Sequence, residues 1–525
     1  MKKGLAVAMA DQVKSKKPRE GAAQDSCVLT DKAAVKKRKP AITLYVGISL
    51  IIAWFHCIWF VPNAYLNVEL LAWQVTVAWL VMLASSTLAL FVTPLLLRSE
   101  RHLSDVKPLL YVTPAVLSLG GLTLCLGIST TENPVMTIAL PIALGIFNAL
   151  LWIQWGEWYA TIKASYHIGQ VALTVSAVVL FSLAATIVLP TLAGDAFVAL
   201  LPIMSSWCLI RIRTSATCLD YPKPLPQNER SKGFRNALVV GGICISACAA
   251  CYFVVAIIPV PDLAFGDSTF TVGALVGGTV LGVIGAFGKL SRKFDIYRLF
   301  PWMLAFATIA VILYAANDVA LYLPAFLTAL TISLICEILL LMYIGVLSSN
   351  GYISPATAFG FSGGFARAGI LVGNGIAVVF EHNAALEKLL LTPVTMAFMI
   401  ILVVLIIPLV RREYAIAALT APIDSLAELD LQIEAVAKEF GLSSREKDVL
   451  SYVVRGYTAE AIGKQLFISS YTAQTHIQHI YAKTQIHKRS DLIDYVTKRK
   501  VPAGETAPTD RAAIDTLPDY WPFPS

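Results

Sequence analysis

The fold of the last part of this chain is decided by residues 441–500, which read GLSSREKDVLSYVVRGYTAEAIGKQLFISSYTAQTHIQHIYAKTQIHKRSDLIDYVTKRK. The run contains four short patterns of apolar residues at helical spacing. Ser443 and Glu446 form a capping box, because an N-cap hydroxyl accepts from a free amide of the first turn and a carboxylate three residues later reaches back. Val449, Leu450 and Val453 then recur on one helical face. The first helix is therefore expected to begin just after Ser443.

Two further helices follow, separated by a tight turn. Gly456 closes the first helix, and Thr458 can cap the next one. The turn falls at Ile468-Ser469, and Ser469 can cap a third helix over about 470–484. The residues expected to face inward on these two helices are Ile462, Leu466, Ile477 and Ile480. A second helix, a tight turn and a third helix of this kind present a recognition helix to the DNA major groove.

This segment resembles the LuxR-type helix-turn-helix family, whose pattern reads roughly L-T-x-R-E-x-E-V-L, a Gly, I-S-x-x-T-V-K-x-H and a closing K-L-x-V. The matching residues are Leu442, Ser443, Arg445, Glu446, Val449, Leu450, Gly456, Ile468, Ser469, Thr472, His476, Ile480, Lys483 and Ile486. The resemblance implies an all-α, four-helix domain over 441–500 that binds double-stranded DNA. It also implies a homodimer on inverted half-sites and RNA polymerase as a partner.

By the same resemblance, the expected DNA contacts come from Ser469, Tyr471, Thr472, Gln474, Thr475, Gln478, Lys483, Lys488 and Arg489. The family's T-V-K reads Thr472-Ala473-Gln474 here, so an amide replaces a usual cation. Gln can pair bidentately with adenine. With fewer cations, binding is expected to be weaker and less dependent on salt than in the family. Lys488 and Arg489 are expected on phosphate, with a merely solvated face as the alternative.

The rest of the chain is too apolar for a soluble protein. Its 525 residues are 57% hydrophobic and 14% charged, with a mean hydropathy of +0.69, whereas soluble domains carry about 25% charged residues. Apolar stretches of about twenty residues recur and predict a polytopic membrane protein. The predicted spans are Ile42–Pro62, Leu71–Leu97, Leu109–Ser129, Pro134–Tyr159, Gly169–Pro190, Ala196–Ile212, Asn236–Pro259, Thr271–Leu290, Leu299–Ala316, Leu321–Leu347, Phe359–Phe380 and Leu391–Val410.

The orientation of these spans follows from the charges of the loops, since cytoplasmic loops are enriched in Lys and Arg. The basic residues of the leader and of alternate loops include Lys36, Lys37, Arg38, Lys39, Arg98, Arg101, Lys107, Lys163, Arg211, Arg213, Lys223, Arg230, Lys232, Arg235, Lys289, Arg292, Lys293 and Arg298. Only Lys388 lies on the opposite side. Both termini are therefore expected in the cytoplasm, with the chain in the inner membrane of a bacterium, and no cleavable signal peptide is expected before the first span.

The spans divide into two halves of six, 41–212 and 236–410, joined by a basic loop at 213–235. This arrangement resembles the major facilitator superfamily in topology, with little support from motifs. Residues 1–40 are expected to form a basic cytoplasmic leader, 411–440 a helical connector and 501–525 a disordered tail. The connector is interpreted either as a plain spacer or as a signalling or dimer-forming helix.

Polar and ionisable groups at bilayer depth are costly, so each is a functional candidate. In major facilitators, spans one, four, seven and ten line the central cavity, and this resemblance directs attention to several side chains. The candidate ligand-binding residues are His56, Trp152, Trp155, Glu157, Tyr252, Glu337 and Arg367. Glu157 lies in the run WIQWGEWY, which suits either a pocket for a small aromatic or cationic ligand or an interfacial aromatic belt. Arg367 is expected to pair with Glu337, as a structural ion pair or as a gate.

The cysteines do not form a disulfide framework, because most lie inside apolar spans. Cys244, Cys248 and Cys251 share one helical face and could hold a soft metal, although small packing residues in a transmembrane helix are the preferred interpretation. No phosphate-binding loop, zinc-ligand spacing or nucleophile elbow occurs in the sequence. The chain is therefore predicted to have no cofactor, no metal and no enzymatic activity.

These patterns predict a membrane-bound regulator in which the transmembrane bundle senses a small-molecule effector and the last domain binds DNA. The alternative is a transporter with an appended DNA-binding domain. A third hypothesis is a membrane anchor without sensing.

Overall fold

The structure is a computed structural model that describes residues 42–60, 76–97, 102–126, 138–161, 168–215, 221–222, 224–290, 299–420, 423–454 and 457–498. The predicted leader, the predicted tail, the helix stop at Gly456 and many of the basic loop residues lie outside these ranges. Every regular element along the described residues is a helix, so the described part of the chain is all-α. The chain divides into two compact units, Met1–Thr420 and Ala421–Ser525.

The described part of the first unit contains twelve long helices, one for each predicted span. They are α3 (Ile42–Phe60), α4 (Val77–Leu96), α5 (Leu109–Cys125), α6 (Leu140–Ala160), α7 (Ile168–Val188), α8 (Thr191–Ser215), α9 (Gln227–Ile257), α10 (Thr269–Leu290), α11 (Leu299–Ala315), α12 (Val319–Ser349), α13 (Pro355–Glu381) and α14 (Ala384–Thr420). Eight of them are long and apolar enough to cross a membrane. Large apolar side chains on the outside of the bundle, such as Leu95 and Phe181, are exposed, as a lipid-facing surface requires.

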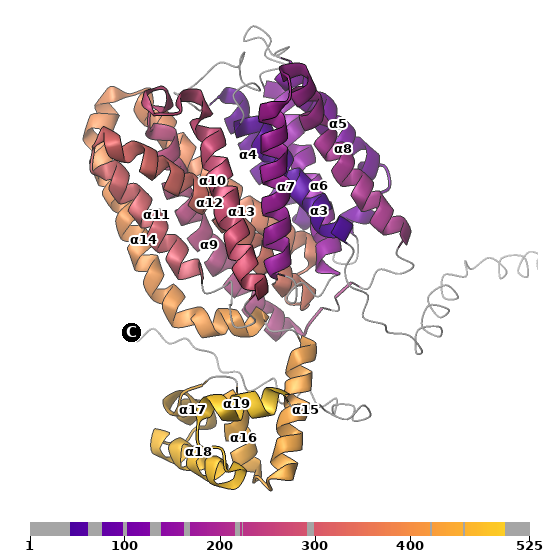
Figure 1. The fold of residues 1–525 in the computed structure, drawn as a ribbon, viewed down its shortest axis with the longest axis vertical. Coiled ribbons are helices and arrows are strands. Elements are labelled where there is room, and N and C mark those ends of the chain that lie inside the picture. Colours follow the sequence, from indigo (N-terminus) through magenta and orange to yellow (C-terminus); the bar gives the residue numbers. More distant parts are fainter. Residues whose placement is uncertain are drawn as a thin grey trace, which may run out of the picture. The chain divides into compact units, whose positions relative to one another are not determined.

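The core of this unit is built around α12, which is almost wholly buried over its apolar stretch. By contrast, α14 is mostly exposed and runs beside α11 along one edge of the bundle (Figure 1). The glycines of α13 allow its backbone to approach α9 closely. A Cβ at Gly369 would lie 2.6 Å from the carbonyl oxygen of Ile245, and one at Gly373 would lie 2.4 Å from that of Ala249. Glycine at these two positions therefore allows α13 to pack closely against α9.

The second unit contains α15 (Ile423–Glu439), α16 (Ser444–Val454), α17 (Ala459–Leu466), α18 (Ser470–Thr484) and α19 (Arg489–Lys498). Its buried core is formed by Ile433, Val436, Val449, Leu450, Tyr452, Val453, Val454, Ile462, Ala473, Ile477, Ile480, Leu492 and Val496. The connector helix α15 contributes Ile433 and Val436 to this core, so its C-terminal half is more than a plain spacer.

Helix α15 ends in a Schellman motif. Gly441 has φ +58°, a left-handed conformation that a glycine adopts without strain. The amide of Leu442 then donates back to the carbonyl of Ala437 at 2.9 Å. This stop places Ser443 at the start of α16 and sets the entry into the helix-turn-helix.

Candidate functional site

The first candidate site is the helix-turn-helix, which begins with the predicted capping box. The amide of Ser443 donates to Glu446 Oε2 at 2.7 Å, and the amide of Glu446 donates to Ser443 Oγ at 3.2 Å. Both bonds of the box are therefore confirmed. The side chain of Glu446 is only 7% exposed, and it also accepts from Lys483 Nζ at 2.7 Å. Burial raises the pKa of Glu446, but the bonds from Lys483 and Ser443 outweigh it and hold this pKa below its usual value.

Helix α18 has the bounds and the buried stripe that the sequence predicts. Ser469 caps it by accepting from the amide of Thr472 at 2.9 Å. Ile477 and Ile480 are buried, as expected, and Ala473 is buried between them and the cap. The opposite face presents Tyr471, Thr472, Gln474 and Gln478 as exposed side chains, while Thr475 is half-buried. This face carries amides and hydroxyls, the groups that read or touch base edges in a major groove.

Two of the three cations expected on DNA are held within the domain. Lys483 bonds to Glu446 and also donates to the carbonyl of Gly441 at 3.1 Å. Arg489 donates to the carbonyls of Val453 and Tyr457 at 3.2 and 2.5 Å. Lys488 is exposed, and its ammonium has no bonding partner among the described residues. Of the three, Lys488 is thus the side chain that is available for a phosphate.

The turn before α18 holds a residue that sequence reasoning missed. Phe467 has φ +54° and is 94% exposed, beside Tyr471, which is 82% exposed. Gly463 makes the tight turn possible, because a Cβ there would lie 2.8 Å from the carbonyl oxygen of Ile468. In the sequence, Phe467 could have been noticed as an aromatic residue that directly follows the second helix and lies outside its apolar stripe. Two exposed aromatic rings therefore flank the start of the recognition helix.

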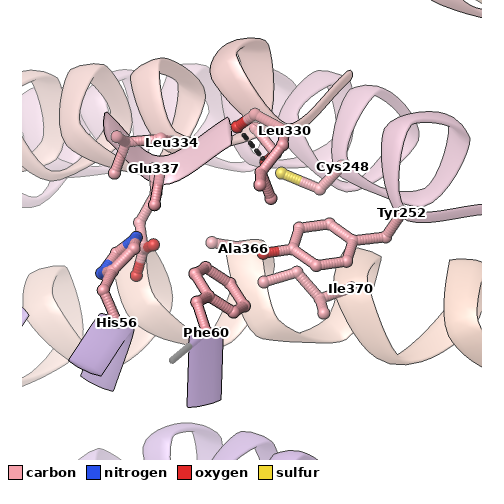
Figure 2. A pocket seen from close by; sticks show the side chains of 11 residues that line it. His56, Phe60, Cys248, Tyr252, Leu330, Leu334, Glu337, Ala366 and Ile370 are labelled. Atoms are coloured by element: carbon pink, nitrogen blue, oxygen red, sulfur yellow. Dashed lines mark hydrogen bonds between the residues drawn. The ribbon is translucent and has the colours of Figure 1, made fainter. Parts of the chain in front are cut away.

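The second candidate site is a pocket inside the first unit, lined by residues of α3, α9, α10, α12 and α13 (Figure 2). Its lining residues are His56, Phe60, Cys248, Tyr252, Ala274, Leu330, Ser333, Leu334, Glu337, Ala366 and Ile370. Three of the predicted ligand-binding residues, His56, Tyr252 and Glu337, therefore come together here. The free space holds no more than about one water-sized sphere.

Two polar groups of this pocket are arranged to accept hydrogen bonds. His56 Nδ1 lies 2.8 Å from the carbonyl oxygen of Ile52, and because a carbonyl only accepts, this nitrogen carries the proton. Nε2 of the neutral ring is then left as an acceptor. Glu337 is buried and makes no hydrogen bond and no ion pair within the part of the chain that the structure describes. His56 and Glu337 both line this pocket (Figure 2).

Arg367 does not form the expected ion pair with Glu337. Its guanidinium donates to Asn148 Oδ1 at 3.0 Å and to the carbonyl of Gly363 at 3.3 Å. It also lies over the rings of Trp152 and Phe55, at 5.1 and 5.5 Å from their centroids. Glu337 and Arg367 interact electrostatically but are not in contact. Arg367 is therefore held by an amide and two aromatic faces instead of by a carboxylate.

Glu157 lies apart from the pocket and organises a loop. Its two carboxyl oxygens accept hydrogen bonds from the amides of Leu103 and Ser104, both at 2.7 Å. These amides begin the short helix η2 (Leu103–Asp105), which lies between α4 and α5. His102 Nδ1 is 4.0 Å from the same carboxyl group. Each carboxyl oxygen of Glu157 thus accepts a hydrogen bond from a backbone amide.

The loop around η2 is held by further contacts. The ring of His102 stacks on that of Tyr221, with centroids 3.6 Å apart and planes 7° apart. Arg213 donates to the carbonyl of Ser104. Burial lowers the pKa of His102 against the opposing effect of Asp105, and burial raises the pKa of Tyr221 to about 12. Both rings are therefore neutral and stacked at neutral pH.

The tryptophans of WIQWGEWY are buried, so the interpretation as an interfacial belt is wrong. Trp152 donates from Nε1 to the carbonyl of Phe359 at 3.1 Å, and Trp155 donates to Ser205 Oγ at 2.8 Å. Neither residue lines the pocket. The two indoles pack α6 against α13 and α8. The ring of Trp152 also lies against the guanidinium of Arg367.

The predicted cysteine face meets a cysteine that sequence reasoning missed. Cys244 and Cys248 of α9 lie near Cys336 of α12, with the Sγ atoms of Cys244 and Cys336 2.8 Å apart. Cys251 lies outside this group. No spacing rule points to Cys336, because it lies in a different span and is separated from Cys244 by 92 residues.

Comparisons with known proteins bear on each unit. Residues 441–496 match the family described as "Bacterial regulatory proteins, luxR family". Over 62 residues the chain is 39% identical to a candidate HTH-type transcriptional regulator of Mycobacterium tuberculosis, a match that covers 12% of this chain and 7% of that protein. Over 60 residues it is 33% identical to the oxygen regulatory protein NreC of Staphylococcus carnosus, covering 11% of this chain and 28% of that protein. The chain therefore spans only a small part of the length of these relatives.

The crystal structure of an auto-inhibited POT family peptide transporter is similar to this chain with a TM-score of 0.44 and 12% identity. The match covers 72% of this chain and 95% of that one.

The family match and the geometry of α16–α18 identify residues 441–496 as a LuxR-type helix-turn-helix domain, a DNA-binding module. The chain thus joins such a regulatory domain to a unit of apolar, membrane-type helices.

Proposed function

We propose that this chain is a membrane-bound, one-component transcriptional regulator whose transmembrane bundle senses a cationic small molecule. The observation that carries the proposal is Glu337, a carboxyl group buried in the pocket of a membrane unit without a bonding partner among the described residues. The same chain carries a LuxR-type DNA-binding domain. Under this proposal, one polypeptide carries both the sensor and the output.

The chemistry of the pocket favours a ligand with a positive charge and an apolar body. A buried carboxylate is costly unless a cation or hydrogen-bond donors satisfy it. Nε2 of His56 is a second acceptor that lines the same pocket, so a protonated amine has two groups to which it could donate. Phe60 and Tyr252 provide aromatic faces for the rest of the ligand. Arg367 interacts with Glu337 electrostatically but forms no ion pair with it, and its guanidinium donates to Asn148 and Gly363 instead.

The small size of the pocket supplies a mechanism. Because it holds no more than about one water-sized sphere, any larger ligand must bind a state in which helices around it have moved apart. A ligand shifts an equilibrium only if its affinity differs between the two states, and this ligand would bind the open state alone. Such coupling between two sites typically changes an affinity by about 5- to 150-fold. Effector binding in the bundle is therefore able to change the affinity of the last domain for DNA.

The output side follows from the LuxR-type domain. We infer binding as a homodimer on inverted half-sites, with Gln474 and Gln478 reading bases, Lys488 on phosphate and RNA polymerase as the downstream partner. Basic residues in alternate loops support cytoplasmic termini and a bacterial inner membrane as the location. This topology would place the DNA-binding domain on the side of the chromosome.

A ligand screen on the purified full-length protein in detergent tests the proposal. Small aromatic and aliphatic amines are compared with neutral isosteres by thermal shift. Amines are expected to raise the melting temperature by mass action, and Glu337→Gln should abolish that shift. The control is Glu387→Gln, which changes a carboxylate that does not line the pocket. An equal shift with neutral isosteres, or a full shift in Glu337→Gln, would reject a cation site at Glu337.

Two further experiments separate regulation from the other hypotheses. A reporter driven by the native promoter should respond to the same amine, and replacement of 1–410 by an inert membrane anchor should remove the response. A response that survives this replacement would show an anchor without sensing. Accumulation of the amine in vesicles, with no effect on the reporter, would instead favour a transporter.

A further inference from the structure

Three cysteine side chains from two helices meet in the interior of the membrane unit. Cys244 and Cys248 are four residues apart on α9, and Cys336 lies on α12. Their sulfur atoms are all within 4.8 Å of one another, and each residue is buried. Among the described residues, this is the one group of three His, Cys, Asp or Glu side chains whose ligand atoms lie so close together.

The geometry suits a single ion between the three sulfurs. Sulfur ligands at ~2.3 Å from one ion in a trigonal plane lie ~4 Å from each other. The observed limit of 4.8 Å is compatible with this arrangement. The Sγ atoms of Cys244 and Cys336 are 2.8 Å apart, so this pair must open by about 1 Å to hold such an ion.

Packing alone does not account for the way these sulfurs face each other. A cysteine that only fills space in a helix interface behaves as a small apolar residue and needs no polar partner. Here the thiol of Cys244 has Cys336 as its partner, through Sγ at 2.8 Å and through the carbonyl oxygen at 3.9 Å. Cys251 is also buried on α9, yet it stays outside the group.

We propose that Cys244, Cys248 and Cys336 bind a soft, thiophilic metal ion of the Cu(I) type. Thiolate ligands select such ions over hard cations, and three ligands suit an ion that does not require the tetrahedral set of structural zinc. The thiols lose protons when the metal binds, because thiolates are the ligands. The positive charge of the ion then balances thiolates that would be costly on their own in this apolar interior.

The pocket adjoins the cluster. Cys248 lines the pocket, and its sulfur is visible among the lining side chains in Figure 2. An ion bound by the cluster ties α9 to α12, the helices that carry Tyr252 and Glu337. This inference does not rest on the proposed sensing of amines, because ion binding is measured on the protein itself.

The test is a Cu(I) competition on full-length protein, reduced and handled without oxygen in detergent. Cys27 and Cys218, which lie outside the described residues, are first replaced by serine so that they bind no copper. The Cu(I) complex of bicinchoninate is the probe, and loss of its colour reports transfer to the protein. The starting protein is expected to take up one Cu(I) per chain.

Variants on both helices locate the site. Cys244→Ser and Cys336→Ser are each expected to weaken Cu(I) binding by roughly tenfold or more, because loss of even supporting groups around a metal costs that much. Cys57→Ser and Cys208→Ser, at buried cysteines outside the group, are the matched controls and should bind as the starting protein does. Melting curves without copper show whether each variant is folded.

X-ray absorption at the copper edge keeps the proposal testable if a cluster variant fails to fold. The expected spectrum shows three sulfur neighbours at ~2.3 Å. Four results would overturn the proposal: no uptake of Cu(I), uptake unchanged in both cluster variants, nitrogen or oxygen neighbours in the spectrum, or a Cys244–Cys336 disulfide that persists in the reduced protein by peptide mass analysis.

Discussion

The ammonium of Lys483 lies 2.7 Å from the carboxylate of Glu446, which is 37 residues earlier in the chain. This contact joins the recognition helix α18 to the first turn of α16. Lys483 is the only Lys or Arg of α18, and it is occupied within the domain. The affinity of this domain for DNA should therefore depend on amide and hydroxyl contacts and on few phosphate contacts.

Lys483→Met and Lys488→Ala should have different effects on DNA binding. Lys488 is free to contact a phosphate, so its loss should weaken all sequences alike and lower the slope of log K against log salt by ~0.9. Lys483→Met keeps the aliphatic stem and should leave this slope nearly unchanged. Fluorescence anisotropy of full-length protein on promoter DNA at several salt concentrations gives both slopes. A drop in slope for Lys483→Met would show that this lysine contacts DNA.

The stability of the second unit should fall in acid because of Glu446. Its pKa in the folded state lies below the ordinary value of 4.5, so the unfolded state binds the proton more readily. The stabilisation is present above the unfolded pKa and is lost as pH falls through the folded one. Thermal melts between pH 7 and pH 3 are expected to show a loss of stability below about pH 4.5 that Glu446→Gln lacks. Parallel curves for the two proteins would contradict the role of this carboxylate.

Gln474→Ala should change the base preference of the domain. A bidentate amide–adenine pair contributes about 1–3 kcal/mol of discrimination, and alanine cannot form it. Binding to a randomised operator library, read by sequencing, should show one position of each half-site losing its preference while the others remain. Tyr471→Ala, on the same exposed face, is a useful comparison because it removes a ring and no amide. A library profile identical to that of the starting protein would remove Gln474 from the set of base-reading residues.

Local patterns predicted much of this structure, and long-range partners explain what they missed. The capping box at Ser443, the cap at Ser469 and the twelve apolar helices each depend on neighbours in sequence or on hydropathy, so they could be predicted. The role of Glu157 could not, because its partners are backbone amides 53 and 54 residues away, which leave no side-chain signature. The same reason hid Cys336 from the cysteine face of α9. The pairing of Arg367 was predicted from charge alone, whereas an amide and two aromatic rings hold it.

Glu157→Gln and Glu337→Gln should separate a structural carboxyl group from a sensing one. In Glu157→Gln, the new side-chain amide could accept from only one of the two backbone donors, since its NH₂ group would face the other N–H. Losing a charge-assisted bond and leaving a buried donor without a partner costs about 2–3 kcal/mol, so Glu157→Gln should lower the melting temperature of the full-length protein. Its response to amines should remain. Glu337→Gln should still fold, because the carboxyl group it removes makes no hydrogen bond and no ion pair among the described residues, and Arg367 keeps its bonds to Asn148 and Gly363.

The two variants are compared in one experiment, with melting temperature and the amine-induced shift measured on the same samples. A reporter from the native promoter is read in parallel, with membrane levels checked by blot. The expected result is a double dissociation, in which Glu157→Gln loses stability and keeps the shift while Glu337→Gln keeps stability and loses the shift. If Glu157→Gln abolished the shift in protein that is still folded, Glu157 would belong to the ligand site despite its place outside the pocket. That result would require the loop around η2 to move with the bundle when the effector binds.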